Sequence, residues 1–191
     1  GDHRDLHSFP TRRSSDLGYQ LVTTIDTLTE GVHVRASTPA KDIAHKSLAV
    51  NLSDIAAMGA KAKYFILALA LPKIDKPWLQ EFSDSLKQLS GHYEVSLIGG
   101  DTTRGPLNIT ITMFGMVENS KAMKRSGARP GDSVYVSGTI GDAGFCFWKL
   151  SNGLIPNNQE LKRLNCPIPR VELGLVRSEE HTSELQSRAY L

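Results

Sequence analysis

The spacing of apolar residues along the chain predicts two helices in its first half. Apolar residues recur at helical intervals at Ala44, Leu48, Leu52 and Ile55. We expect this helix to have Thr38 as its N-cap, to start at a proline and to end at Gly59. A second amphipathic helix is expected over residues 77–89, where leucine and phenylalanine recur with the same period.

Runs rich in β-branched and aromatic residues predict strands between these helices. They span residues 19–25, 64–71, 95–98 and 108–117. The nearly continuous apolar run 64–71 is typical of a strand covered on both faces. Alternating strands and helices indicate an α/β (α+β layered) fold, in which the strand order is not readable from one sequence.

The chain continues past this region with the beginning of a second unit. After the turn-like residues 129–132, a new strand is expected over residues 133–138, followed by helices over 141–150, 158–164 and 170–176. Too few residues follow to complete a second core. We therefore expect a first domain over residues 18–118 and the beginning of a truncated second α/β domain over residues 119–176.

Both ends of the chain differ from the part between them. Residues 1–17 and 177–191 are polar, rich in serine and arginine, and lack periodicity. Their segments HSFPTRRSSDL and RSEEHTSELQS resemble translations of the two adapter oligonucleotides used in short-read sequencing. We expect both ends to be foreign, which removes His3, His7 and His181 as site residues; the alternative is a pair of natural disordered tails.

Composition argues against several classes of protein. A net charge of +2 without a continuous basic patch gives no reason to expect a nucleic-acid partner. No apolar run approaches the roughly 20 residues of a membrane helix and no signal peptide opens the chain, so we expect a cytoplasmic location and no membrane partner. The two cysteines, Cys146 and Cys166, lack metal-site spacing and are expected to be free thiols.

Three aspartates are candidates for a metal site. Asp54 lies among small and apolar residues of the first predicted helix, on a polar stripe with Ser47 and Asn51. Asp26 ends the first predicted strand, and Asp101 lies in a loop after the third. If these carboxylates converge, oxygen ligands without a matching His/Cys set favour magnesium and phosphate chemistry. The alternative for Asp54 is a solvated or hydrogen-bonded structural carboxylate.

The segment GGDTTRG adds candidate phosphate-binding groups. Gly99 and Gly100 would let backbone N–H groups approach a polyphosphate, although a simple turn also explains a double glycine. No GxxxxGK[ST] sequence occurs, which excludes an ordinary P-loop. Arg125 is either a phosphate ligand or a surface charge, and His33 follows Asp26 closely but a lone histidine is more often structural.

Four segments together resemble the thiamine-monophosphate kinase family. They are TIDTLTEGVH, HKSLAVNLSDIAAMGA, LIGGDTTRGP and RSGARPGD, in the same order and with similar separations. The resemblance implies the aminoimidazole ribonucleotide synthetase-like fold, in which residues 18–118 form the nucleotide- and magnesium-binding domain and also the dimerisation domain. It also implies ATP-dependent phosphorylation of thiamine monophosphate to thiamine diphosphate by in-line transfer, with several Mg²⁺ ions and a homodimer.

Site residues follow from the resemblance position by position. Asp26, Asp54 and Asp101 resemble magnesium ligands, as do the positions of Thr24 and Ile25, where Ile25 has only a backbone carbonyl to offer. Gly100, Asp101 and Arg125 resemble nucleotide-binding residues, and His33 resembles a residue that contacts thiamine phosphate. No separate catalytic residue is expected.

Two alternatives stay open: another ATP-using synthetase of the same superfamily, and a non-catalytic nucleotide-binding dimerisation module. We expect the fragment by itself to lack kinase activity.

Overall fold

The computed structural model describes residues 18–179, and side chains to Val176. The first unit consists of β1 (Tyr19–Thr29), α1 (Ala40–Ala57), β2 (Lys61–Leu71), α2 (Lys76–His92), β3 (Ser96–Arg104) and β4 (Asn108–Glu118). The second consists of the 3₁₀ turn η2 (Arg125–Gly127), α3 (Asp142–Ser151), α4 (Asn158–Asn165) and α5 (Val171–Glu179). The expected α/β fold is confirmed.

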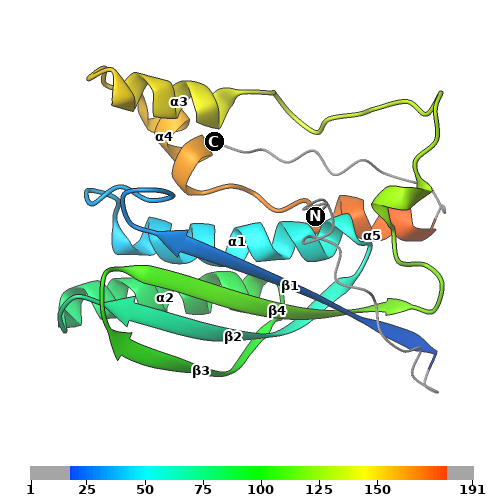
Figure 1. The fold of residues 1–191 in the computed structure, drawn as a ribbon, viewed down its shortest axis with the longest axis horizontal. Coiled ribbons are helices and arrows are strands. Elements are labelled where there is room, and N and C mark those ends of the chain that lie inside the picture. Colours follow the sequence, from blue (N-terminus) through cyan, green and yellow to red (C-terminus); the bar gives the residue numbers. More distant parts are fainter. Residues whose placement is uncertain (1–17, 180–191) are drawn as a thin grey trace, which may run out of the picture.

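Four strands form one mixed sheet in the order β1-β4-β2-β3 (Figure 1). β4 pairs antiparallel with both β1 and β2, whereas β2 and β3 are parallel. The parallel pair is possible because α2 connects the two strands as a crossover helix.

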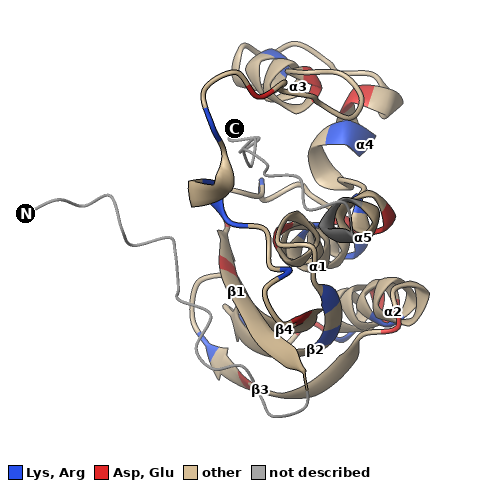
Figure 2. Ribbon diagram, turned by 90° about the vertical axis from the view of Figure 1, so that its right-hand side faces the viewer, with Lys and Arg blue, Asp and Glu red and all other residues tan. Residues whose placement is uncertain are grey.

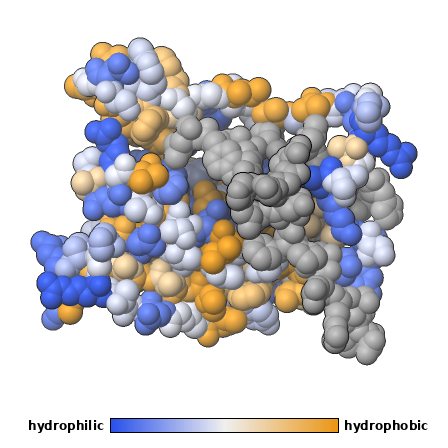
Figure 3. Space-filling model, in the orientation of Figure 1, coloured by the Kyte–Doolittle hydropathy of each residue, from blue (hydrophilic) through white to orange (hydrophobic). Residues whose placement is uncertain are grey.

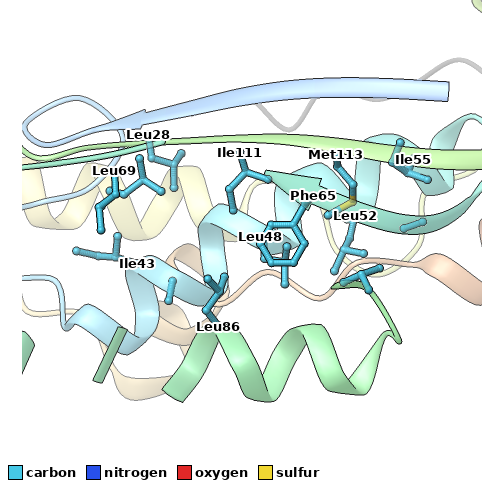
Figure 4. Packing of buried hydrophobic residues seen from close by; sticks show 14 of the residues in the cluster. Leu28, Ile43, Leu48, Leu52, Ile55, Phe65, Leu69, Leu86, Ile111 and Met113 are labelled. Atoms are coloured by element: carbon cyan, nitrogen blue, oxygen red, sulfur yellow. The ribbon is translucent and has the colours of Figure 1, made fainter. Parts of the chain in front are cut away.

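Helices α1 and α2 cover one face of the sheet, and the opposite face carries no helix among the described residues (Figure 2). The core lies between the sheet and these helices, where Leu48 and Leu52 of α1 meet Phe65 of β2 and Ile111 of β4 (Figure 4). Each of these four side chains is at most 1% exposed. The core therefore fixes α1 against the sheet.

The expectation that β2 is covered on both faces is wrong. Phe65 and Leu69 are buried, but Tyr64 is 49% and Ile66 36% exposed on the uncovered face. The run reads as continuously apolar because this face is itself apolar, and it continues across β1 at Leu21 and Ile25. Apolar residues also reach the surface in the lower part of Figure 3, where Figure 1 places the sheet. We call this surface the open sheet face.

The ends of α1 differ in part from the prediction. Its N-cap is Pro39, without a side-chain hydrogen bond, and Thr38 instead accepts a hydrogen bond at Oγ1 from the Arg35 N–H. At the other end Gly59 takes a left-handed conformation, with φ of +67°, as expected of a C-terminal capping residue. α2 begins one residue earlier than predicted because Asp75 caps it by accepting from the Trp78 N–H.

The second unit forms three helices, but residues 133–138 form no strand, which corrects the prediction for that segment. α3 and α4 pack together, and Lys149 of α3 makes a 2.6 Å ion pair with Glu160 of α4. α5 packs on the end of α1, where Gly174 lies against the Ala56 carbonyl. Residues 1–17 and 180–191, predicted to be foreign, lie outside the described residues.

Both thiols are free, and Cys146 is buried while Cys166 is partly exposed. None of the helices in the described part of the chain is long and apolar enough to cross a membrane.

Candidate functional site

A hydrogen bond between β1 and α1 forms the centre of the candidate site. Thr24 Oγ1 donates to Asp54 Oδ2 at 2.8 Å. Even-numbered residues of β1 face α1, as the burial of Val22 and Leu28 shows, so Thr24 and Asp26 both point to the helix side. The sequence predicted a shorter strand that ends at Asp26, whereas Asp26 lies within β1. The structure therefore brings Thr24 and Asp54 together, with Asp26 on the same face.

The predicted polar stripe on α1 continues from this contact into the protein interior. Ser47 donates to the Ile43 carbonyl at 2.7 Å, and Asn51 Nδ2 donates to the Ser47 carbonyl at 3.0 Å. Asn51 is fully buried, and its Oδ1 has no hydrogen-bond partner. Residues three apart on a helix are neighbours, so this oxygen lies one turn from Asp54. An oxygen that receives no hydrogen bond, such as Asn51 Oδ1, suits a divalent cation or a water bound to it.

Asp101 lies on the other side of the sheet from this group. Residues 99–104, predicted as a loop, belong to β3. Strand pairing places Asp101 in one row with Ala68, Thr110 and Thr27, which is the row of the open sheet face. Among the described residues no group of three His, Cys, Asp or Glu side chains is close enough to hold a metal ion. Asp26, Asp54 and Asp101 therefore do not converge on one shared site within the described residues.

The conformation of Gly100 has a structural cause. Its φ is +156°, and a Cβ at this position would collide with the carbonyl oxygen of Leu67 on β2. Glycine is thus needed for β3 to approach β2. At Gly99, by contrast, a Cβ would only contact Ile66 Cγ2 at 3.8 Å.

Ile25 and Arg125 are both exposed. The Ile25 side chain is 53% exposed on the open sheet face, pointing away from Asp54, so only its backbone is available on the side of Asp54. Arg125 begins η2, on the connection that leaves β4. Their predicted ligand roles stay predictions.

His33 lies in the tight loop that follows β1. The Thr29 N–H donates to His33 Nδ1 at 3.1 Å, and the His33 N–H donates back to the Thr29 carbonyl at 2.9 Å. Gly31 allows the turn, with φ of +81°. The loop forms one wall of a small pocket whose other wall is formed by Phe147 of α3 and Leu164 of α4. His33 thus faces the junction of the two units.

Lys46 lies next to the His33 loop, and the sequence did not single it out. It is 8% exposed on α1, and its Nζ donates to the His33 carbonyl at 2.9 Å. Burial lowers the pKa of this amine. Its position among buried neighbours such as Ile43 and Ala49 was the available signal, because a lysine on the apolar side of a helix needs a partner.

Comparisons with known proteins agree with the fold and with the resemblance. Residues 13–117 match the family "AIR synthase related protein, N-terminal domain". The thiamine-monophosphate kinase of Salmonella typhimurium is 43% identical over 179 residues, covering 91% of this chain and 53% of the relative. The chain therefore spans about half the length of this relative.

Solved structures give the same result. A thiamine-monophosphate kinase from Stenotrophomonas maltophilia superposes with a TM-score of 0.82 at 41% identity, covering 86% of this chain and 55% of that one. AaThiL complexed with AMPPCP and TMP superposes with a TM-score of 0.79 at 27% identity, covering 87% and 55%. The chain belongs to the AIR synthase related family, and the relatives to which it is similar are thiamine-monophosphate kinases.

Proposed function

We propose that the chain is part of an ATP-dependent kinase that phosphorylates thiamine monophosphate to thiamine diphosphate. The observation that carries this proposal is the 43% identity to a thiamine-monophosphate kinase over 91% of the chain. The related AaThiL, solved with AMPPCP and TMP, supports ATP and thiamine monophosphate as the two ligands.

The Thr24–Asp54 contact and the buried Asn51 oxygen support magnesium as the metal. Asp54 and Asp26 would hold the cation, with Thr24 orienting the Asp54 carboxylate. Bound magnesium would neutralise the charge of the ATP phosphates during transfer. The protein groups then act by positioning and charge, which requires no nucleophile from this chain.

We further propose a homodimer that buries the open sheet face. Apolar side chains are exposed in adjacent rows of this face, at Leu21, Ile25, Tyr64 and Ile66. Monomeric proteins rarely leave such a contiguous apolar patch uncovered. Asp101 lies on the same face and would therefore be near the partner subunit.

The dimer is tested by sedimentation with Ile66→Glu. This change should give a monomer, whereas Ile74→Glu, at a residue 84% exposed outside the strands, should not. A wild-type monomer at high protein concentration would contradict the dimer.

Because the chain spans about half of its relatives, we propose that it has no appreciable kinase turnover by itself. A cytoplasmic location and the absence of nucleic-acid and membrane partners stay predictions.

Calorimetry with Mg·ATP tests ligand binding directly. We expect binding by the wild-type chain and loss of about tenfold or more in affinity for Asp54→Asn, since one charge-assisted contact is removed. Asp84→Asn, on the exposed face of α2, is the matched control and should bind as the wild type. Equal affinity for both variants would contradict the assignment of Asp54.

Thiamine monophosphate separates the kinase from the alternative synthetases. In the presence of AMPPCP, the kinase requires saturable binding of thiamine monophosphate. A chain that binds Mg·ATP but not thiamine monophosphate would instead support another ATP-using member of the superfamily.

A further inference from the structure

The hydrogen bonds of His33 determine which ring nitrogen carries its proton. The Thr29 N–H can only donate, so His33 Nδ1 must be the acceptor in their 3.1 Å contact. A neutral ring then has its proton on Nε2. Within the described part of the chain, the structure records no acceptor for this Nε2–H. The ring therefore has one free donor and lines the pocket between the two units.

The polar residues that line the pocket could bind an anion. Arg35 and Thr38 line it on the same side as His33, and Asn165 on the other. None of its lining residues in the described part is an aspartate or a glutamate. A hydrogen-bond donor and an arginine that line one pocket, without a carboxylate among the described lining residues, favour an anionic oxygen such as that of a phosphate monoester.

Lys46 ties this loop to α1. Its Nζ reaches the His33 carbonyl across 13 residues of sequence, and the described residues offer it no carboxylate partner. A buried ammonium without hydrogen bonds is strongly unfavourable, so Lys46 and the loop constrain one another. The same helix carries Asp54, so one rigid element fixes both the predicted metal side and the predicted substrate side.

We propose that Lys46 is a positioning residue that holds His33 as an Nε2–H donor toward a phosphate monoester. The ligand part of this inference rests on the proposed function, whereas the tautomer and the role of Lys46 stand on the geometry of this chain. Lys46 acts through the loop backbone and does not itself touch the ligand.

Nitrogen-15 NMR of the histidine rings in the 191-residue chain tests the inference, with His33→Gln to assign the signal. The wild type should show an Nε2–H ring whose Nδ1 lacks a proton. Lys46→Met keeps the length of the side chain but removes the donor, and should give averaged tautomers. Lys46→Arg restores a charged donor and should restore the wild-type signal; Lys87→Met, at an exposed lysine of α2, should leave it unchanged.

Two results would overturn the role of Lys46: an Nδ1–H ring in the wild type, or an unchanged ring signal in Lys46→Met. Should Lys46→Met fail to fold, the wild type still decides. Its Lys46 ammonium protons should then exchange with water far more slowly than those of Lys87, and equally fast exchange would contradict the proposed hydrogen bond.

Titration with thiamine monophosphate and with inorganic phosphate tests the ligand. We expect the His33 Nε2 signal to shift on binding of thiamine monophosphate, with about tenfold weaker affinity in Lys46→Met. An Nε2–H ring that depends on Lys46 but responds to neither ligand would refute the proposed substrate while retaining the positioning role. The two failures are therefore distinguishable.

Discussion

Thr24 of β1 and Asp54 of α1 are joined by a 2.8 Å hydrogen bond that links residues 30 positions apart. Thr24 faces α1 because of the alternation of β1, and Asp54 lies one helical turn beyond the buried Asn51. The bond orients a carboxylate that has no basic neighbour on its own helix.

This bond should contribute measurably to stability. Thr24→Val removes the donor to Asp54 and should lower the free energy of unfolding by about 1–2 kcal/mol, since the bond involves a charged group and is only partly buried. Urea denaturation of Thr24→Val, Asp54→Ala and the double variant should give a coupling energy of about 1 kcal/mol. Thr112→Val, on the open sheet face, is the control, and its loss of unfolding free energy should simply add to that of Asp54→Ala. If the losses of Thr24→Val and Asp54→Ala also add fully, the bond contributes nothing to stability.

Gly100 should be far less tolerant of a side chain than its neighbour. Gly100→Ala places a Cβ against the Leu67 carbonyl at a positive φ, and should cost about 3 kcal/mol or more by distorting the β2–β3 pairing. Gly99→Ala is the matched control, because its Cβ would make an ordinary contact with Ile66 at 3.8 Å. Denaturation of both variants checks this, and similar losses would show that the close approach of the strands is not the cause.

The sequence was sufficient to predict α1 and its capping glycine, because helical periodicity and Gly59 are local signals. It was insufficient for β3, because a double glycine is typical of a turn. Only the pairing with β2 shows that Gly99 and Gly100 belong to a strand. The apolar run of β2 also could not show whether one or both of its faces are covered. Tyr64 and Ile66 are apolar but lie on the open sheet face.

Candidate site residues were predictable as a set but not as an arrangement. Thr24, Asp26 and Asp54 share one side because strand alternation and helix packing agree. Asp101 lies on the other side because it pairs with Ala68, and a shift of one residue in that register would have reversed its direction. Such register is set by long-range pairing, which one sequence does not reveal.

Two helix glycines should respond to alanine with opposite signs. Gly174→Ala puts a Cβ against the Ala56 carbonyl and should destabilise the packing of α5 on α1 by about 2 kcal/mol. At Gly144 of α3 a Cβ meets nothing within 4 Å, so Gly144→Ala should stabilise the protein by about 0.5–1 kcal/mol. Thermal unfolding measures the stability of both variants, and hydrogen exchange of the α5 amides measures the packing of α5 on α1. Unchanged protection of the α5 amides in Gly174→Ala would contradict the contact between Gly174 and Ala56.

Cys166 should react slowly with alkylating reagents despite its partial exposure. Burial, together with the carboxylate of Asp42, raises the pKa of its thiol to about 11. Its Sγ lies 3.5 Å from Asp42 Oδ1, to which the thiol donates. Only about 1% of this thiol would be ionised at pH 9, and the thiolate is the reactive form. In a Cys146→Ala background, the rate of reaction with iodoacetamide should therefore still be rising between pH 9 and 11.

Asp42→Asn removes the charge of this carboxylate. It should lower the pKa of the Cys166 thiol and speed alkylation at pH 9 by about three- to tenfold. Asp84→Asn is the control, since Asp84 lines a surface groove together with Asp42 and Cys166 but does not shift the pKa of the thiol. The raised pKa also affects stability, because the Cys166 thiol holds its proton more tightly in the folded than in the unfolded state. The contribution of this thiol to the free energy of unfolding is complete below pH 9 and is lost as the pH rises toward 11. If Asp42→Asn and Asp84→Asn react at the same rate as the parent, burial alone raises the pKa.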